Sequence, residues 1–125
     1  MGEALTIEVG HGRGYAIVTV TGEIDISTAT QLRERLFELA PSGRPLIADL
    51  DRVGFIDSAG LSALAGAAKR AAGYGGSLQV ICARPKTRQL LRLTGLDRRI
   101  PLARTLDEAL AALAAARTVN PPASR

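Results

Sequence analysis

The sequence predicts an α/β domain built on a mixed, mostly parallel β-sheet of four to five strands packed with about four helices. Short runs of β-branched and aliphatic residues alternate with longer amphipathic segments, a pattern typical of parallel strands joined by crossover helices. The first two strand-like runs are separated only by a short glycine-rich turn, so we expect that pair to be antiparallel. At 125 residues, of which 46% are hydrophobic, the chain suffices for one domain with its own core.

Composition excludes several classes of function. Aromatic residues make up 3% of the chain and tryptophan is absent, which leaves too few rings for a platform that stacks nucleic-acid bases. The net charge of +4 comes from scattered arginines, and the densest stretch, residues 84–99, is interpreted as a solvated helix face rather than a nucleic-acid patch. No signal peptide or membrane segment is expected. The single cysteine, Cys82, fits a reducing cytoplasm.

The strands are expected at residues 5–9, which form an edge strand, and at residues 15–20, with a short buried strand at 46–48. Another is expected at 78–82 and a last short one at 100–102. The glycines of residues 10–14 form a turn. A phosphate-binding loop would have to lead into a helix, whereas this turn leads into a strand.

Helices are expected after Thr28, from Ser58 to about residue 72, from Pro85 to the stop at Gly95, and after Thr105. Thr28 with Gln31, and Thr105 with Glu108, have the spacing of capping boxes. We therefore expect one domain over residues 1–117. Residues 118–125 contain two prolines and little to bury, so they are predicted to form a flexible C-terminal tail.

The candidate site is the Asp57-Ser58 pair at the start of the second helix. Asp57 can cap the free N–H groups there, and alone it would be an ordinary helix cap. At 100° per residue, one face of the following helix is predicted to pack on the sheet, formed by Leu61, Leu64, Ala65, Ala68, Ala71 and Ala72. An adjacent stripe consists of Ser58, Ser62, Gly66 and Lys69.

The stripe carries almost no bulky side chain before Lys69, and Gly66 lowers helix stability by about 1 kcal/mol relative to alanine. A helix face that contacts only solvent does not require such small residues, whereas a face that a protein partner approaches closely does. The stripe is therefore a candidate docking surface. Composition bias toward small residues remains the alternative explanation.

Three segments carry a resemblance to a known family. They are residues 22–25 (Gly-Glu-Ile-Asp) with Thr28-Ala29, residues 55–61 (Phe-Ile-Asp-Ser-Ala-Gly-Leu), and residues 90–96 (Leu-Leu-Arg-Leu-Thr-Gly-Leu) before the last helix. In order and spacing, over about residues 5–116, the chain resembles the STAS domain. More narrowly, it is similar to the stand-alone anti-sigma factor antagonists.

The resemblance implies a partner-switching regulator of transcription. In its unphosphorylated state such an antagonist binds an anti-sigma factor that is also a serine kinase, and this releases the sigma factor. Phosphorylation of the serine that corresponds to Ser58 ends the binding, and a metal-dependent serine phosphatase restores it. Asp25 and Asp57 match acidic positions associated with partner contact. In the family the residue after the phosphorylated serine is often a second hydroxyl residue, but here it is Ala59. This departure leaves Ser58 as the clear acceptor, and Ser62 remains a minor candidate.

The same resemblance implies a monomer in the free state. From the residues themselves, no cofactor and no binding of nucleic acid or membranes is expected, since the positive charge is scattered and no apolar run reaches membrane-spanning length. One alternative is a STAS scaffold that is never phosphorylated, such as a stress-complex or lipid-transport subunit. An enzyme is disfavoured, because no pattern in the sequence places the lone His11 beside Cys82 or a serine in a catalytic arrangement. Asp49, Asp51 and Asp57 are explained by turn and cap roles rather than by a metal site.

Overall fold

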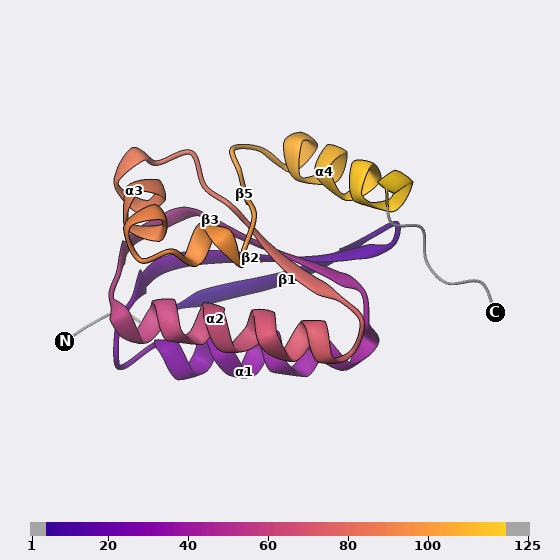
Figure 1. Cartoon of the computed structure of the whole chain (residues 1–125). Helices are drawn as coiled ribbons and strands as arrows, with labels where there is room; N and C mark the ends of the chain where they lie inside the picture. Colours follow the sequence, from indigo (N-terminus) through magenta and orange to yellow (C-terminus); the bar gives the residue numbers. More distant parts are fainter. Residues whose placement is uncertain (1–4, 120–125) are drawn as a thin grey trace.

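A single five-stranded sheet organises residues 5–119, the part of the chain that the computed structural model describes (Figure 1). The elements run in the order β1 (Thr6–Gly12), β2 (Tyr15–Ile24), α1 (Ala29–Leu39), the 3-10 turn η1 (Ala40–Ser42), β3 (Pro45–Ile56), α2 (Ser58–Gly73), β4 (Ser77–Ile81), α3 (Pro85–Leu93), the 3-10 turn η2 (Leu96–Arg98), β5 (Leu102–Ala103) and α4 (Leu106–Val119).

The strand order across the sheet equals the order along the chain, β1-β2-β3-β4-β5. β1 and β2 are antiparallel, and the three remaining pairs are parallel. The predicted fold class, including the antiparallel first pair and the edge position of β1, is confirmed. The glycine-rich turn is shorter than predicted, because β1 continues to Gly12 and only Arg13 and Gly14 connect the strands.

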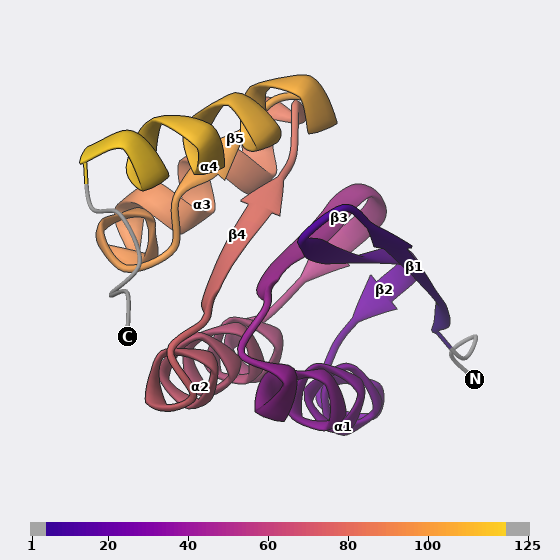
Figure 2. The same ribbon diagram turned by 90° about the vertical axis from the view of Figure 1, so that its right-hand side faces the viewer.

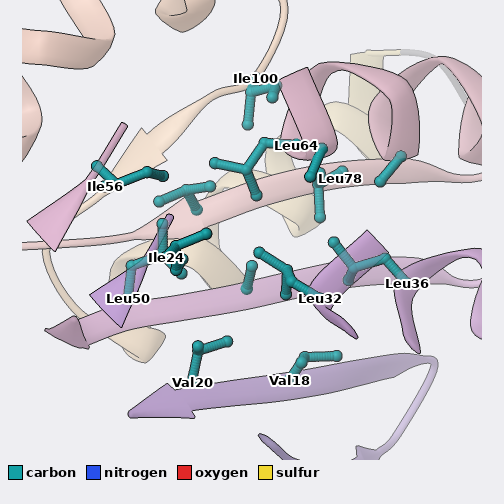
Figure 3. Packing of buried hydrophobic residues seen from close by; sticks show 14 of the residues in the cluster. Val18, Val20, Ile24, Leu32, Leu36, Leu50, Ile56, Leu64, Leu78 and Ile100 are labelled. Atoms are coloured by element: carbon teal, nitrogen blue, oxygen red, sulfur yellow. The ribbon is translucent and has the colours of Figure 1, made fainter. Parts of the chain in front are cut away.

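Helices cover the two faces of the sheet unequally. α1 and α2 lie side by side against one face, and α4 lies over the other (Figures 1 and 2). The larger core lies between the sheet and the α1–α2 pair, where Val18, Val20 and Leu50 of the strands meet Leu32 and Leu64 of the helices (Figure 3).

A smaller cluster lies under α4 and consists of Ile47, Ile81, Ala103 and Ala109. Near β1 and β2 the same face carries polar residues. The cross-strand pair Val9 and Val18 packs into the larger core, so the next pair along the ladder, Glu8 and Thr19, faces the opposite side. On this face the sheet is buried where β3 to β5 contribute to the cluster, whereas Tyr15 and Ile17 of β2 pack against the edge of the cluster and are half-buried.

β3 is much longer than the short strand predicted at residues 46–48, since it continues through Ile56. Leu50, Val53 and Ile56 are buried along the added length, and β3 stays paired with β2 as far as Ile24. The prediction was wrong because Asp49 and Asp51 were interpreted as a turn. Charged side chains are tolerated within this strand since they lie outside the larger core.

The capping box predicted at Thr28 is also wrong. The Thr28 hydroxyl donates to the carbonyl of Glu23 at 2.7 Å, and the Gln31 side chain donates to the carbonyl of Leu5 at 3.0 Å. The two side chains therefore tie α1 to β2 and to the residue that precedes β1 instead of capping its own first turn. Tertiary contacts supplied better partners than the local backbone.

At α4, Thr105 accepts from the amide of Glu108 at 3.1 Å, as predicted, whereas the Glu108 carboxylate accepts from the amide of Arg104 rather than Thr105. α4 reaches Val119. The predicted tail at residues 118–125 thus begins within α4, and residues 120–125 lie outside the described part of the chain. Among the described helices, none is both long and apolar enough to cross a membrane.

Candidate functional site

Asp57 caps the N-terminus of α2. Its backbone is extended, with φ −109° and ψ −171°, and its Oδ1 accepts hydrogen bonds from the amides of Ala59 at 2.9 Å and Gly60 at 3.2 Å. Two of the amides that lack a partner in the first helical turn are thereby satisfied. The predicted cap role of Asp57 is confirmed, and Ser58 becomes the first residue of the helix.

The side chain of Ser58 is exposed at this end of α2. Within the described part of the chain, no hydrogen bond to its hydroxyl is present. An oxygen that is both exposed and free of internal partners is accessible to a docking protein, and it can be modified without breaking an existing contact.

Gly60 explains how α2 is seated on the sheet. A Cβ atom at this position would lie 2.6 Å from the side chain of Ile24 and 2.6 Å from that of Ile56, closer than packed carbon atoms can approach. Glycine therefore lets the first turn of α2 rest directly on the ends of β2 and β3. This seating fixes the position of Ser58 relative to both strands.

Asp25 organises the loop between β2 and α1. Its Oδ1 accepts from the hydroxyl of Ser27 at 2.6 Å, from the amide of Ser27 at 2.9 Å and from the amide of Thr28 at 3.2 Å. These donors, the Ser27 hydroxyl first among them, hold the pKa of the Asp25 carboxyl below its usual value. Asp25 is therefore a charged residue with a fixed orientation.

The structure brings the two predicted acidic residues together. Asp25 and Asp57 directly follow Ile24 and Ile56, which are paired in the parallel ladder of β2 and β3. Each carboxylate uses Oδ1 for its own loop or helix cap, and in the described structure no hydrogen bond to either Oδ2 is present. The second oxygen of each carboxylate is available to a donor from outside the chain.

The exposed face of α2 corresponds largely to the predicted stripe. Ser58, Ser62 and Lys69 are exposed, and Gly66 is half-buried beside α1, where an added Cβ would lie 3.8 Å from the ring of Phe37. The prediction of the buried face was partly wrong, because Ala65 and Ala68 are half-buried and Ala72 is exposed. The residues buried on α2 are Gly60, Leu61, Ala63, Leu64, Ala67 and Ala71.

This difference has a structural cause. The predicted face assumed contact with the sheet alone, whereas Ala63 and Gly66 lie on the side of α2 that faces α1. The buried face of α2 is therefore shifted around the helix toward α1.

A groove beside Ser58 was not predicted. It measures about 280 Å³ and is shallow, and it runs between the start of α1 and the first turns of α2. Its lining residues are Ile26, Ala29, Thr30, Arg33, Ala59, Ser62 and Ala63.

Two large apolar side chains close to the site in sequence are exposed. Ile26, which lines the groove, is 83% exposed, and Phe55, three residues before Ser58, is 51% exposed. An isoleucine between Asp25 and Ser27, in a turn where polar residues predominate, was the available sequence signal for this surface.

The remaining candidates lie elsewhere or have structural roles. Asp49 accepts from the amide of Asp51 at 3.1 Å, and Asp51 accepts from the amide of Ala83 at 2.7 Å. Cys82 is buried, whereas His11 lies 3.1 Å from a guanidinium nitrogen of Arg44 on the surface. The structure therefore does not bring His11 and Cys82 together as a catalytic pair. Among the described residues, no group of three or more His, Cys, Asp or Glu side chains could hold a metal ion.

Comparison with protein families identifies the class of protein that this fold and site define. The STAS domain matches residues 6–109, which is most of the chain. The chain belongs to the STAS domain family. The match includes both carboxylate positions, Ser58 and the whole of α2.

Individual relatives agree with this assignment. The chain is 34% identical to the anti-sigma-F factor antagonist RsfB of Mycobacterium tuberculosis over 109 residues, which cover 86% of this chain and 88% of RsfB. It is 37% identical to an anti-sigma factor antagonist from Mycobacterium paratuberculosis of known crystal structure, with a TM-score of 0.80 and coverage of 88% and 94% of the two chains. Unphosphorylated SpoIIAA, an anti-sigma factor antagonist, shares the fold at 20% identity, with a TM-score of 0.72 and coverage of 88% and 97%.

Proposed function

We propose that this protein is an anti-sigma factor antagonist whose binding is controlled at Ser58. In the unphosphorylated state it binds an anti-sigma factor with serine kinase activity, and the sigma factor is released. Phosphorylation of Ser58 by that kinase ends the binding, and a serine phosphatase restores it. The observation that carries the proposal is the exposed Ser58 hydroxyl at the head of α2, beside two carboxylates held by their own loops.

The site favours a switch that acts on binding rather than on folding. A phosphate group adds about −1.5 to −2 charges at neutral pH. At the N-terminus of a helix the dipole favours an anion, and Ser58 has no internal hydrogen bond that the modification would break. The phosphorylated protein is therefore expected to keep its fold.

Binding is affected because the phosphate enters an interface next to Asp57 and close to Asp25. Repulsion from these carboxylates and the cost of removing water from the phosphate oppose the approach of a partner. A penalty of about 3–4 kcal/mol weakens binding by two to three orders of magnitude. The free Oδ2 atoms of both carboxylates are suited to accept hydrogen bonds from basic groups of the partner in the unphosphorylated state.

SpoIIAA provides an independent indication from a protein of the same fold. It has been solved in an unphosphorylated and in a phosphorylated form, and the phosphorylated form superimposes on this chain with a TM-score of 0.65 at 21% identity. A protein of this fold can thus carry the modification and remain ordered, which supports the proposal for Ser58.

The first experiment maps the modification. The protein is incubated with candidate anti-sigma kinases, ATP and magnesium, and the modified residue is identified by mass spectrometry in wild type, Ser58→Ala and Ser62→Ala. Phosphate is expected on Ser58 in wild type and in Ser62→Ala, but not in Ser58→Ala. Modification of Ser62 alone would contradict the assignment of the acceptor.

The second experiment compares the affinities of the phosphorylated and unphosphorylated proteins for the same anti-sigma factor. Equal affinities would refute the switch. A protein that binds tightly yet is never phosphorylated by any kinase would instead support the alternative of a STAS scaffold.

A further inference from the structure

The surface where α1 meets α2 has an uneven charge distribution. Asp25 and Asp57 lie at the end next to Ser58, whereas the side chains farther along are cationic: Arg33 on α1, and Lys69 and Arg70 on α2. The acidic residues of α1, Glu34 and Glu38, lie on the opposite flank of the helix, since both border β1.

Two of these cations are held in place by an aromatic ring. The guanidinium groups of Arg33 and Arg70 lie 5.4 Å and 4.8 Å from the ring centroid of Phe37, and that of Arg70 also lies 5.8 Å from the ring of Tyr74. We call Arg33, Phe37, Arg70 and Tyr74 the cation–aromatic cluster. A guanidinium stacked on a ring keeps its hydrogen-bonding edge free for a carboxylate and loses less side-chain freedom when it binds one.

The cluster is continuous with the groove beside Ser58. Arg33 lines the groove together with Ser62 and Ile26. Gly66, one turn beyond Ser62, leaves open the space in front of Phe37. A partner segment that contacts Ser58 can therefore extend along the groove to the cluster without meeting a bulky side chain on α2.

Within the described residues, none of these three cations forms an ion pair with an acidic side chain. The ion pair found there joins a different arginine, Arg35, to Glu38 at 3.8 Å. Extending the proposed function, on which this inference rests, we propose that the groove and the cation–aromatic cluster bind an acidic segment of the anti-sigma factor. Carboxylates of that segment pair with Arg33, Lys69 and Arg70, and an apolar pocket of the partner receives the exposed side chain of Ile26. This contact selects the partner, whereas Ser58 controls whether binding occurs.

The pattern fits a protein better than a nucleic acid or an anionic membrane. A polyanion would be repelled at the Ser58 end by the two carboxylates, and three cations offer few phosphate contacts. A protein surface can present basic groups to Asp25 and Asp57 and acidic groups to the cluster. Arginine and aromatic residues are also the types enriched at the centres of protein interfaces.

The decisive variant is the double reversal Arg33→Glu/Arg70→Glu, and the single reversal Arg13→Glu is the control for a charge change away from the groove. Arg13 is exposed on the β1–β2 turn, at the other end of the sheet from Ser58. Each protein is titrated against the anti-sigma-F factor of Mycobacterium tuberculosis, the factor named for the relative RsfB. The double reversal is expected to weaken binding by at least about tenfold and to reduce its salt dependence. The control is expected to bind like wild type.

Two outcomes separate this inference from the proposed function. If wild type binds and the double reversal binds equally well, the groove and the cluster do not select the partner. If wild type does not bind, the proposed function fails for that factor. A second probe then tests the surface itself: a synthetic peptide of glutamate and leucine is titrated while amide NMR signals are followed.

Shifts at Arg33, Phe37, Lys69 and Arg70 that are lost in the double reversal support the acidic-segment site. Shifts confined to the exposed arginines of α3 and η2 overturn it. Binding of duplex DNA that is abolished by the same reversal also overturns it, in favour of a nucleic-acid surface. Thermal unfolding of every variant establishes that the changes in binding do not reflect a loss of folded protein.

Discussion

The backbone amide of Asp57 donates a hydrogen bond to the carbonyl oxygen of Ile24 at 3.1 Å. This bond joins the end of β2 to the residue that caps α2, and it continues the ladder in which Ile24 pairs with Ile56. The loop of Asp25 and the start of α2 are therefore parts of one rigid corner of the sheet.

Gly60→Ala should destabilise the domain by about 1–3 kcal/mol, because its Cβ would collide with Ile24 and Ile56. Urea unfolding monitored by circular dichroism measures the free energy. Gly66→Ala is the matched control on the same helix. The space beside Phe37 accepts its methyl group, so it should be neutral or stabilise by up to about 1 kcal/mol. Equal losses in the two variants would contradict the close seating of the first turn of α2.

Asp57→Ala should cost about 1 kcal/mol of unfolding free energy, because two amides of α2 lose their acceptor. Asp57→Asn keeps an Oδ1 acceptor and should retain most of that stability. If Asp57 also contacts the partner through its charge, Asn should still weaken binding. Stability and affinity measured on both variants separate the two roles. An asparagine variant as unstable as the alanine variant would show that the cap depends on charge rather than on hydrogen bonds.

Phosphorylated wild type should unfold within a few degrees of the unmodified protein, because a helix N-terminus accommodates an anion. Calorimetry on the two purified forms gives the comparison. Its companion measurement is partner affinity, which should fall by about two to three orders of magnitude for a penalty of 3–4 kcal/mol. A large drop in the melting temperature would mean that the switch acts by unfolding.

Ser27→Ala should raise the pKa of Asp25 toward its ordinary value, since the Ser27 hydroxyl is the main cause of the lowered pKa. NMR titration of the carboxyl carbon measures this change. The pKa in the folded state lies below that in the unfolded state. The stabilising contribution of Asp25 is thus fully present above its ordinary pKa and is lost as the pH falls through the lowered value. Ser62→Ala, in the neighbouring groove, should leave the titration unchanged.

Local sequence patterns were sufficient for most of the fold. The alternation of strands and helices predicted the mixed sheet, and Asp57 before an apolar helix predicted the cap. The full length of β3 was not predicted, because Asp49 and Asp51 resemble turn residues until their strand is seen between two paired neighbours. Their environment depends on the sheet rather than on adjacent residues.

The candidate site was only partly predictable for the same reason. Ser58, Ser62 and Lys69 share one helix face, so their spacing placed them together. Phe37 and Arg70 lie more than thirty residues apart, and only the packing of α1 on α2 brings them into contact. The groove depends on which sides of α1 and α2 face each other. Helical periodicity predicts the buried face of a single helix, but it does not predict how two helices are oriented against each other.

The close packing of Gly60 in α2 against β2 and β3 has a consequence for the rate at which the protein regains binding. Since the first turn already lies in contact with Ile24 and Ile56 and cannot move closer to the sheet, we expect the surface around Ser58 to keep its shape when the serine is phosphorylated. Under the proposed switch, hydrolysis of the phosphoserine ester returns a protein that is competent at once, with no slow rearrangement to follow. The lifetime of the phosphorylated, non-binding form is then expected to follow the rate of the phosphatase.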